Sequence, residues 1–226
     1  MSHFTVMVIG AEPEKQLAPF DENLETPRYV KYTKEQLIEK AKKDTENYKN
    51  GTYARFLADT EKYKLDCKNQ AHIDYLENEF PKKLNRTDEE IYQDEISGYE
   101  PEEIGSDGEV YSNYNPKSKW DWYALGGRWS GLINLKEGAN GNAGRGSLVM
   151  QNEAGIDQAK KGDIANFDEL TTFAVLKDGE WFEKGEMGWW GVVHDKKDEE
   201  LWENELKKLV QGLPDDTLIS IFDCHI

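Results

Sequence analysis

The stretch from Lys119 to Gly131, KWDWYALGGRWSG, concentrates side chains that bind flat, charged ligands. It holds three of the seven Trp residues of the chain, together with one Tyr and one Arg. Aromatic rings stack on nucleobases, and an Arg guanidinium donates paired hydrogen bonds to a phosphate group. The stretch therefore predicts a site that recognises an aromatic ring and an anion together.

A second aromatic motif, GWWG, lies at residues 188–191. On a strand, Trp189 and Trp190 point to opposite faces, so that one ring can pack in the core while the other faces outward. The flanking glycines leave room for a flat ligand to approach. The alternative is that each Trp simply packs in the core, but every buried indole N–H then needs a hydrogen-bond partner.

The predicted ligand site combines these two motifs with two polar residues near the end of the chain. Trp side chains stack on the base, basic side chains hold a phosphate, and the remaining polar groups bond to the base or ribose. The residues assigned to it are Lys119, Trp122, Tyr123, Arg128, Trp129, Trp189, Trp190, Asp223 and His225.

The charge distribution favours a small anion over a long nucleic acid. The chain has 28 Lys and Arg against 45 Asp and Glu, a formal net charge of −17, which repels long nucleic acids and anionic membranes. Residues 115–161 carry seven basic and four acidic side chains, so the first aromatic motif lies in a positive segment. We expect a small nucleotide-like ligand, no long nucleic acid and no membrane as partners, and leave a homo-oligomer open.

The sequence contains no strong catalytic motif, such as HExxH or GxSxG, and we predict no catalytic residue, no metal site and no cofactor. Strand alternation nevertheless places His3 on one face with Thr5 and Met7, and Asp223 on one face with His225. If the first and last strands are neighbours, the two histidines and the aspartate converge. They would then form an acid–base pair, a metal site or a set of hydrogen-bonding groups, the alternative being a solvated strand end.

Several segments predict the sheet that positions these residues. The run FTVMVI at 4–9 is typical of a buried strand, and the segment 217–226 of a closing strand. Residues 120–135 are predicted to form two strands that turn at Gly126 and Gly127. Asp178 and Gly179 predict a second hairpin turn. The glycine-rich segment 138–147 lacks the spacing of a phosphate-binding loop and is expected to be flexible.

The helical part of the chain has a different composition. Residues 33–109 are rich in Lys and Glu, with 12 basic and 20 acidic side chains, and Thr33 with Gln36 matches a capping box. A further amphipathic helix is predicted over 198–211. The fold class expected is α+β: a single domain over 1–226, with a mainly antiparallel sheet, a C-terminal helix packed on it and an acidic helical insertion at 33–109.

The two cysteines and the N-terminus bear on the compartment. Cys67 and Cys224 lie far apart without a CxxC motif, which favours free thiols in a reducing environment. The first residues contain no basic segment followed by a long apolar run, and no segment approaches a membrane span in length. We therefore expect a cytoplasmic protein.

Four blocks, SHFTVMVIG, KWDWYALGGRWSG, GWWG and the terminal DCHI, together resemble a phage and prophage protein family of uncharacterised function. The resemblance spans the chain from first to last strand and leaves the acidic segment 33–109 as the variable part. It implies a phage-encoded product in the cytoplasm of a bacterial host, and it supplies no catalytic residues.

The functional hypothesis combines the implied phage origin with the predicted ligand site. Some small phage proteins with pockets sequester nucleotide second messengers of host antiviral systems. By this analogy we expect a non-catalytic binding protein that sequesters a nucleotide-like immune signal, such as an ADP-ribose derivative or a cyclic nucleotide. Two alternatives stay open: a hydrolase or phosphodiesterase acting on such a nucleotide through His3, Asp223 and His225, and an acidic protein-binding inhibitor of a host defence protein.

Overall fold

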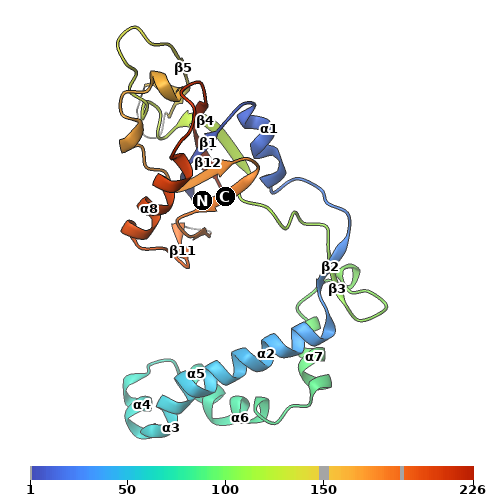
Figure 1. The fold of residues 1–226 in the computed structure, drawn as a ribbon. Coiled ribbons are helices and arrows are strands. Elements are labelled where there is room, and N and C mark those ends of the chain that lie inside the picture. Colours follow the sequence, from blue (N-terminus) through green and yellow to red (C-terminus); the bar gives the residue numbers. More distant parts are fainter. Residues whose placement is uncertain (1, 148–152, 189–190) are drawn as a thin grey trace. The chain divides into compact units, whose positions relative to one another are not determined.

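The computed structural model describes residues 2–147, 153–188 and 191–226, and the chain forms two compact units (Figure 1). One unit comprises Met1–Thr26 and Tyr114–Ile226, and the other comprises Pro27–Asn113. The fold is mixed α and β with a large, mainly antiparallel sheet, which confirms this part of the predicted fold class.

The sheet of the first unit is built around the first and last strands of the chain (Figure 1). Strands β1 (His3–Ile9) and β12 (Leu218–His225) pair antiparallel, with His3 opposite His225 and Ile9 opposite Ile219. The order is β5-β7-β12-β1-β8-β9, and β4 pairs with both β12 and β6. The other strands are β4 (Trp122–Gly127), β5 (Gly141–Ala143), β6 (Arg145–Gly146), β7 (Ile156–Lys160), β8 (Ala174–Lys177) and β9 (Glu180–Glu183).

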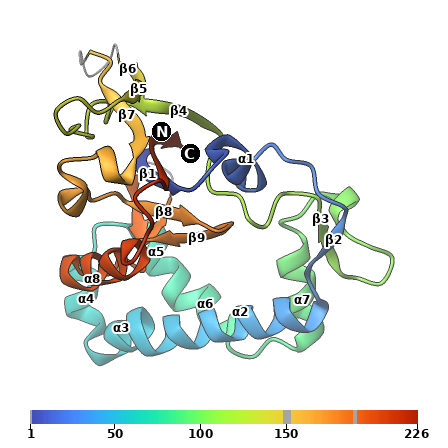
Figure 2. The same ribbon diagram turned by 45° about the horizontal axis from the view of Figure 1, so that its top comes forward.

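Alternation along β1 and β12 divides the hydrophobic core into two layers. Met7, Ile9, Ile219 and Ile221 belong to the cluster that includes the helix α8 (Glu199–Val210). Phe4, Val6, Val8, Phe222 and Cys224 belong to the cluster that includes α1 (Pro13–Leu17) and the short helix η1 (Ala18–Phe20). Figure 2 shows α1 and α8 on different sides of β1 and β8.

Helix α8 begins after Asp198, whose side chain accepts a hydrogen bond of 2.9 Å from the Leu201 backbone N–H. This cap satisfies one of the backbone donors that a helix N-terminus leaves unpaired. Trp202 is fully buried against the sheet, and its indole N–H donates to the Thr172 carbonyl at 2.8 Å. The helix precedes the last strand, so the final element of the chain is β12.

The two predicted hairpins have different outcomes. Strands β8 and β9 pair antiparallel across Asp178 and Gly179, whose φ angles of 54° and 77° suit a tight turn, so this hairpin is confirmed. The prediction of a hairpin at Gly126 and Gly127 is wrong. Both glycines have positive φ and end β4, but the chain then turns away, because the Ser130 side chain and the Gly131 backbone bind Asp157 on β7.

The second unit is mostly helical, and β2 (Tyr29–Tyr32) and β3 (Val110–Ser112) pair antiparallel at its two chain ends. The predicted capping box of Thr33 and Gln36 opens α2 (Lys34–Tyr48). A small core joins Leu37, Tyr92 and Val110. The other helical segments of the second unit are η2 (Lys49–Tyr53), α3 (Ala54–Ala58), α4 (Thr60–Asp66), α5 (Gln70–Asp74), η3 (Tyr75–Glu79), α6 (Phe80–Lys83), α7 (Asp88–Ile96) and η4 (Pro101–Glu103).

The described part of the chain contains no helix with the length and apolar character that a membrane crossing would require. Both cysteines are free thiols: Cys67 is partly exposed and Cys224 is buried in β12. Two short strands, β10 (Glu186–Met187) and β11 (Val193–His194), form a separate ribbon before α8.

Candidate functional site

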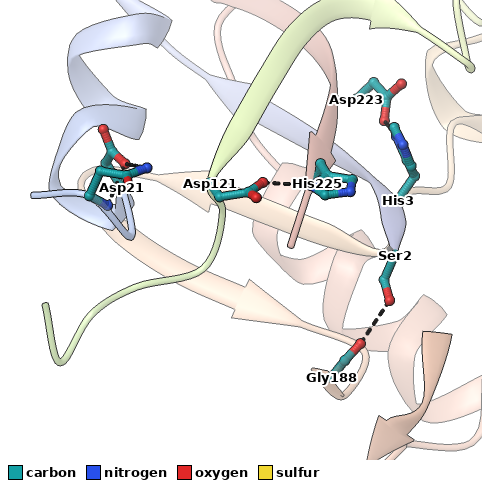
Figure 3. A network of polar contacts seen from close by, with 8 residues as sticks. Ser2, His3, Asp21, Asp121, Gly188, Asp223 and His225 are labelled. Carbon is teal, nitrogen blue, oxygen red and sulfur yellow. Dashed lines mark hydrogen bonds and ion pairs between the residues drawn. The ribbon is translucent and has the colours of Figure 1, made fainter. Parts of the chain in front are cut away.

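The histidines at the two ends of the chain converge with Asp223, as strand alternation predicts (Figure 3). His3 Nδ1 lies 2.8 Å from Asp223 Oδ1, and the ring centroids of His3 and His225 are 4.8 Å apart, edge to face. The sheet face that is apolar at Met7 and Ile221 therefore becomes polar toward the His3 end. There the side chains can meet a ligand instead of packing under α8.

His225 has a carboxylate partner of its own. Its Nδ1 lies 2.6 Å from Oδ1 of Asp121, the residue just before β4. From the sequence, Asp121 could be counted only as one of the acidic charges of its segment. A carboxylate accepts the hydrogen bond, so Nδ1 of each imidazole is the donor and Nε2 of the neutral ring carries the lone pair. Figure 3 shows the resulting arrangement of two neighbouring His–Asp pairs.

Beside these pairs lies a cavity of about 550 Å³. Its walls come from β1, β4, β6, β12 and the residues that follow Gly126. The lining residues are His3, Trp122, Ala124, Gly127, Arg128, Arg145, Gly146, Ser147 and Asp223. A cavity of this size accommodates a small ligand of nucleotide dimensions.

Asp223 connects the cavity wall to the Gly-Gly turn. Its carboxylate is 2% exposed, and Oδ2 accepts a 3.0 Å hydrogen bond from the Arg128 backbone N–H. Gly127 packs so closely that a Cβ there would lie 2.4 Å from the Asp223 side chain. The turn therefore needs glycine both for its positive φ of 55° and for this contact.

Arg145 is a lining residue that sequence reasoning did not assign. It begins β6, which pairs parallel with β4 and places Arg145 opposite Gly126. The glycine-rich segment 138–147 is thus partly β-structure, and the expectation of a flexible loop is wrong. A GRGS motif has no spacing that marks an anion site, so the only sequence signal was a basic residue among glycines in a positive segment.

Trp122 contributes an indole ring to the cavity. It lies opposite His225 on β12, is 47% exposed, and its ring lies 6.2 Å from that of His3. Trp120 is instead buried near α1, and its indole N–H donates to the Leu17 carbonyl. Trp120 therefore lies outside the strand predicted from residue 120, because β4 begins only at Trp122.

Other predicted site residues lie elsewhere. Tyr123 packs on the opposite sheet face against Trp120 and Phe222, and burial raises the pKa of its hydroxyl. Lys119 forms a 2.7 Å ion pair with Glu183 and lines a separate hollow. Trp129 is partly buried and is not among the residues lining the cavity. Trp189 and Trp190 lie outside the described residues.

A buried carboxylate on β7 stabilises the residues that follow the Gly-Gly turn. Asp157 is fully buried on β7 and accepts hydrogen bonds from the Ser130 hydroxyl at 2.5 Å and from the Gly131 backbone N–H at 2.7 Å. The Ser130 oxygen in turn accepts from the Gly155 backbone N–H at 2.9 Å. These contacts anchor the residues immediately after Arg128.

The site has the means for two kinds of chemistry. Arg128 and Arg145 can hold an anion, while two imidazoles with carboxylate-bound Nδ1 atoms can exchange protons through Nε2. Among the described residues, no group of three or more His, Cys, Asp or Glu side chains is arranged to hold a metal ion. Comparison with family models, curated proteins and solved structures finds no match to this chain.

Proposed function

We propose that this protein binds a small nucleotide-like ligand in the cavity lined by His3, Trp122, Arg128 and Arg145, and withdraws that ligand from signalling. One observation carries the proposal: strands β1, β4, β6 and β12 bring an exposed indole, two guanidinium-bearing residues and an imidazole to one cavity. An anion with an aromatic ring complements this set of groups.

The phosphate of the ligand would lie between the two arginines. The whole chain carries −17, so two arginines lining one cavity, one from the turn after β4 and one from β6, are an unusual concentration of positive charge. A guanidinium binds phosphate through two parallel N–H donors. Each such charge-assisted hydrogen bond contributes about 1.5–3 kcal/mol.

The base would stack on Trp122. Stacking a base on an aromatic side chain contributes roughly 1–3 kcal/mol. With the two arginines the described residues supply roughly 4–9 kcal/mol, whereas nanomolar affinity requires about 12 kcal/mol. The remaining binding free energy must come from backbone donors of the Gly-Gly turn, from further side chains or from a second copy of the chain.

The resemblance to phage proteins supports the biological setting. A phage product in the cytoplasm of a bacterial host would gain from capturing an ADP-ribose derivative or a cyclic nucleotide made by an antiviral system. Capture requires only affinity and stoichiometric amounts of protein. The indole and arginine residues of the cavity would supply part of that affinity, and capture needs no catalytic motif.

A second candidate function is hydrolysis of the bound nucleotide. It is favoured by a specific observation, the His3–Asp223 and His225–Asp121 pairs at one side of the cavity. Mass spectrometry of ligand recovered after incubation separates the two functions, because a binding protein returns the ligand unchanged.

Isothermal titration calorimetry against a panel of ADP-ribose derivatives and cyclic nucleotides tests the proposal. Arg128→Ala and Arg145→Ala should each weaken binding roughly 10- to 150-fold, since each removes a charge-assisted contact. Lys119→Ala is the matched control, because Lys119 is paired with Glu183 outside the cavity. Absence of binding across the panel, or equal affinity in the arginine variants and the control, overturns the proposal.

A further inference from the structure

We propose that His3 and His225 act as general base and general acid in the cleavage of ribonucleotide phosphodiesters bound in the cavity. The inference rests on the proposed function and adds a chemical step to it. Ligands whose phosphodiester has a free neighbouring hydroxyl are cleaved, and ligands without one are held intact.

The orientation of the two imidazoles carries the inference. Each Nδ1 donates to a carboxylate, at 2.8 Å for His3 and 2.6 Å for His225, which fixes the ring and leaves Nε2 for proton exchange. Within the described residues neither Nε2 makes a hydrogen bond, and neither is among the buried polar atoms that lack a partner. The side chains of His3 and His225 are 16% and 12% exposed, so both rings are partly accessible to solvent.

The spacing of the two rings suits a shared reaction. Their centroids are 4.8 Å apart, so a ligand that contacts one imidazole lies close to the other. One ring can thus accept a proton while its neighbour donates one. His3 lines the cavity and takes the role of base, and His225 lies directly beside it on β12 and takes the role of acid.

The surrounding charges suit a phosphoryl reaction. Arg128 and Arg145 line the same cavity and stabilise the negative charge that grows on phosphorus-bound oxygens in the transition state. Asp223 and Asp121 stabilise the imidazolium form of whichever ring holds the proton. These four side chains, with the two histidines, are the charged and titratable groups on which the reaction depends.

The step balances without a co-reactant. His3 Nε2 removes the proton of the ribose 2′-hydroxyl, and the 2′-oxygen attacks phosphorus. The new O2′–P bond closes a 2′,3′-cyclic phosphate, while the P–O5′ bond breaks. The leaving 5′-oxygen takes a proton from His225 Nε2, so the net change is one proton transferred and one phosphodiester exchanged.

The dinucleoside monophosphate ApA and its analogue with a 2′-deoxy ribose before the phosphate form a matched pair of probes. Wild-type protein should convert ApA into adenosine 2′,3′-cyclic phosphate and adenosine, detected by liquid chromatography and mass spectrometry, and leave the analogue intact. Turnover should persist in EDTA, because the step consists of proton transfers between ligand and imidazoles. Cleavage of the deoxy analogue, or loss of turnover in EDTA, overturns this mechanism.

His3→Gln and His225→Gln should each lower the turnover rate at least 100-fold, whereas His72→Gln in the helical unit should leave it unchanged. His225→Gln should keep its calorimetric affinity for ApA and lose the alkaline descent of the bell-shaped pH–rate profile, because that limb reports the acid. Asp121→Asn should lower the rate and keep the profile two-sided, as expected of a positioning residue.

Calorimetry separates binding of the dinucleotide from its cleavage. ApA that binds wild-type protein and stays intact overturns catalysis and leaves the proposed binding function standing. ApA that does not bind overturns the inference for this substrate class. The proposed function fails separately, through the nucleotide panel and the arginine variants.

Discussion

The hydroxyl of Ser130 donates a 2.5 Å hydrogen bond to the fully buried carboxylate of Asp157, and this contact holds the chain segment that carries Arg128. Asp157 also accepts from the Gly131 backbone and interacts with the Gly144 backbone N–H. One side chain therefore ties the Gly-Gly turn to the strand segment that contains Arg145. The geometry of the cavity depends on this carboxylate, although it does not line the cavity.

We predict that Asp157→Asn destabilises the protein by about 1–3 kcal/mol, because the amide presents N–H donors where the carboxylate accepts them. Burial, the dominant cause, raises the pKa of Asp157 above its ordinary 3.8. The folded carboxyl group thus keeps its proton where the unfolded chain has lost it, so this contribution to wild-type stability falls as pH rises from 3.8 through the raised value. Urea unfolding across that range should show that the difference in unfolding free energy between wild type and Asp157→Asn becomes smaller as the pH rises. A difference that stays constant with pH would contradict this prediction.

Gly127→Ala should damage both stability and ligand binding. The residue has a φ of 55°, and a Cβ would lie 2.4 Å from Asp223. Gly179→Ala is the control, because Gly179 has a similar φ of 77° with no atom within 4 Å of the added Cβ. Urea unfolding should show a loss of about 1–2 kcal/mol for the control and a larger loss for Gly127→Ala. Equal losses would argue against the close approach at Asp223.

Trp122→Leu should weaken nucleotide binding roughly 5- to 150-fold, the equivalent of one stacked base. The melting temperature should hardly change, because Trp122 is 47% exposed. Leu201→Ala, which removes a 60% exposed side chain from α8, serves as the control for surface substitution. Titration calorimetry with thermal melts on all three proteins checks the prediction, and unchanged affinity in Trp122→Leu would count against stacking.

Cys224 should resist alkylation in the folded protein. Burial raises the pKa of its thiol well above the ordinary 9.0, and the thiolate is the reactive form. Iodoacetamide at pH 8 should therefore modify Cys67, which is partly exposed, and reach Cys224 only after denaturation. Peptide mass spectrometry before and after unfolding measures this. A Cys67→Ser variant that still takes up label when folded would contradict the burial of Cys224.

Part of the site could be predicted from the sequence because strand alternation is a local rule. His3 and His225 each occupy a defined position in a short apolar strand, so their faces follow from counting residues. The Asp178–Gly179 hairpin is equally local, since two residues with positive φ define its turn. The capping box at Thr33 could be recognised for the same reason.

Other features depend on contacts between distant segments and leave no local trace. Asp157 binds Ser130 and Gly131 from 27 and 26 residues away, and this overrides the hairpin that the Gly-Gly pair favours. Arg145 reaches the cavity only because β6 pairs with β4. Lys119 resembled a phosphate ligand by its position in the aromatic motif, and its ion pair with Glu183 could not be foreseen from composition.

The pairing of β1 with β12 also sets the order in which the protein can assemble. His3 and Asp223 are separated by 220 positions, so closing this contact carries a large entropy cost, and high contact order slows folding. During translation, the apolar first strand must wait until β12 has left the ribosome. The cavity is therefore among the last features to form, and nascent chains halted before residue 218 should lack it entirely.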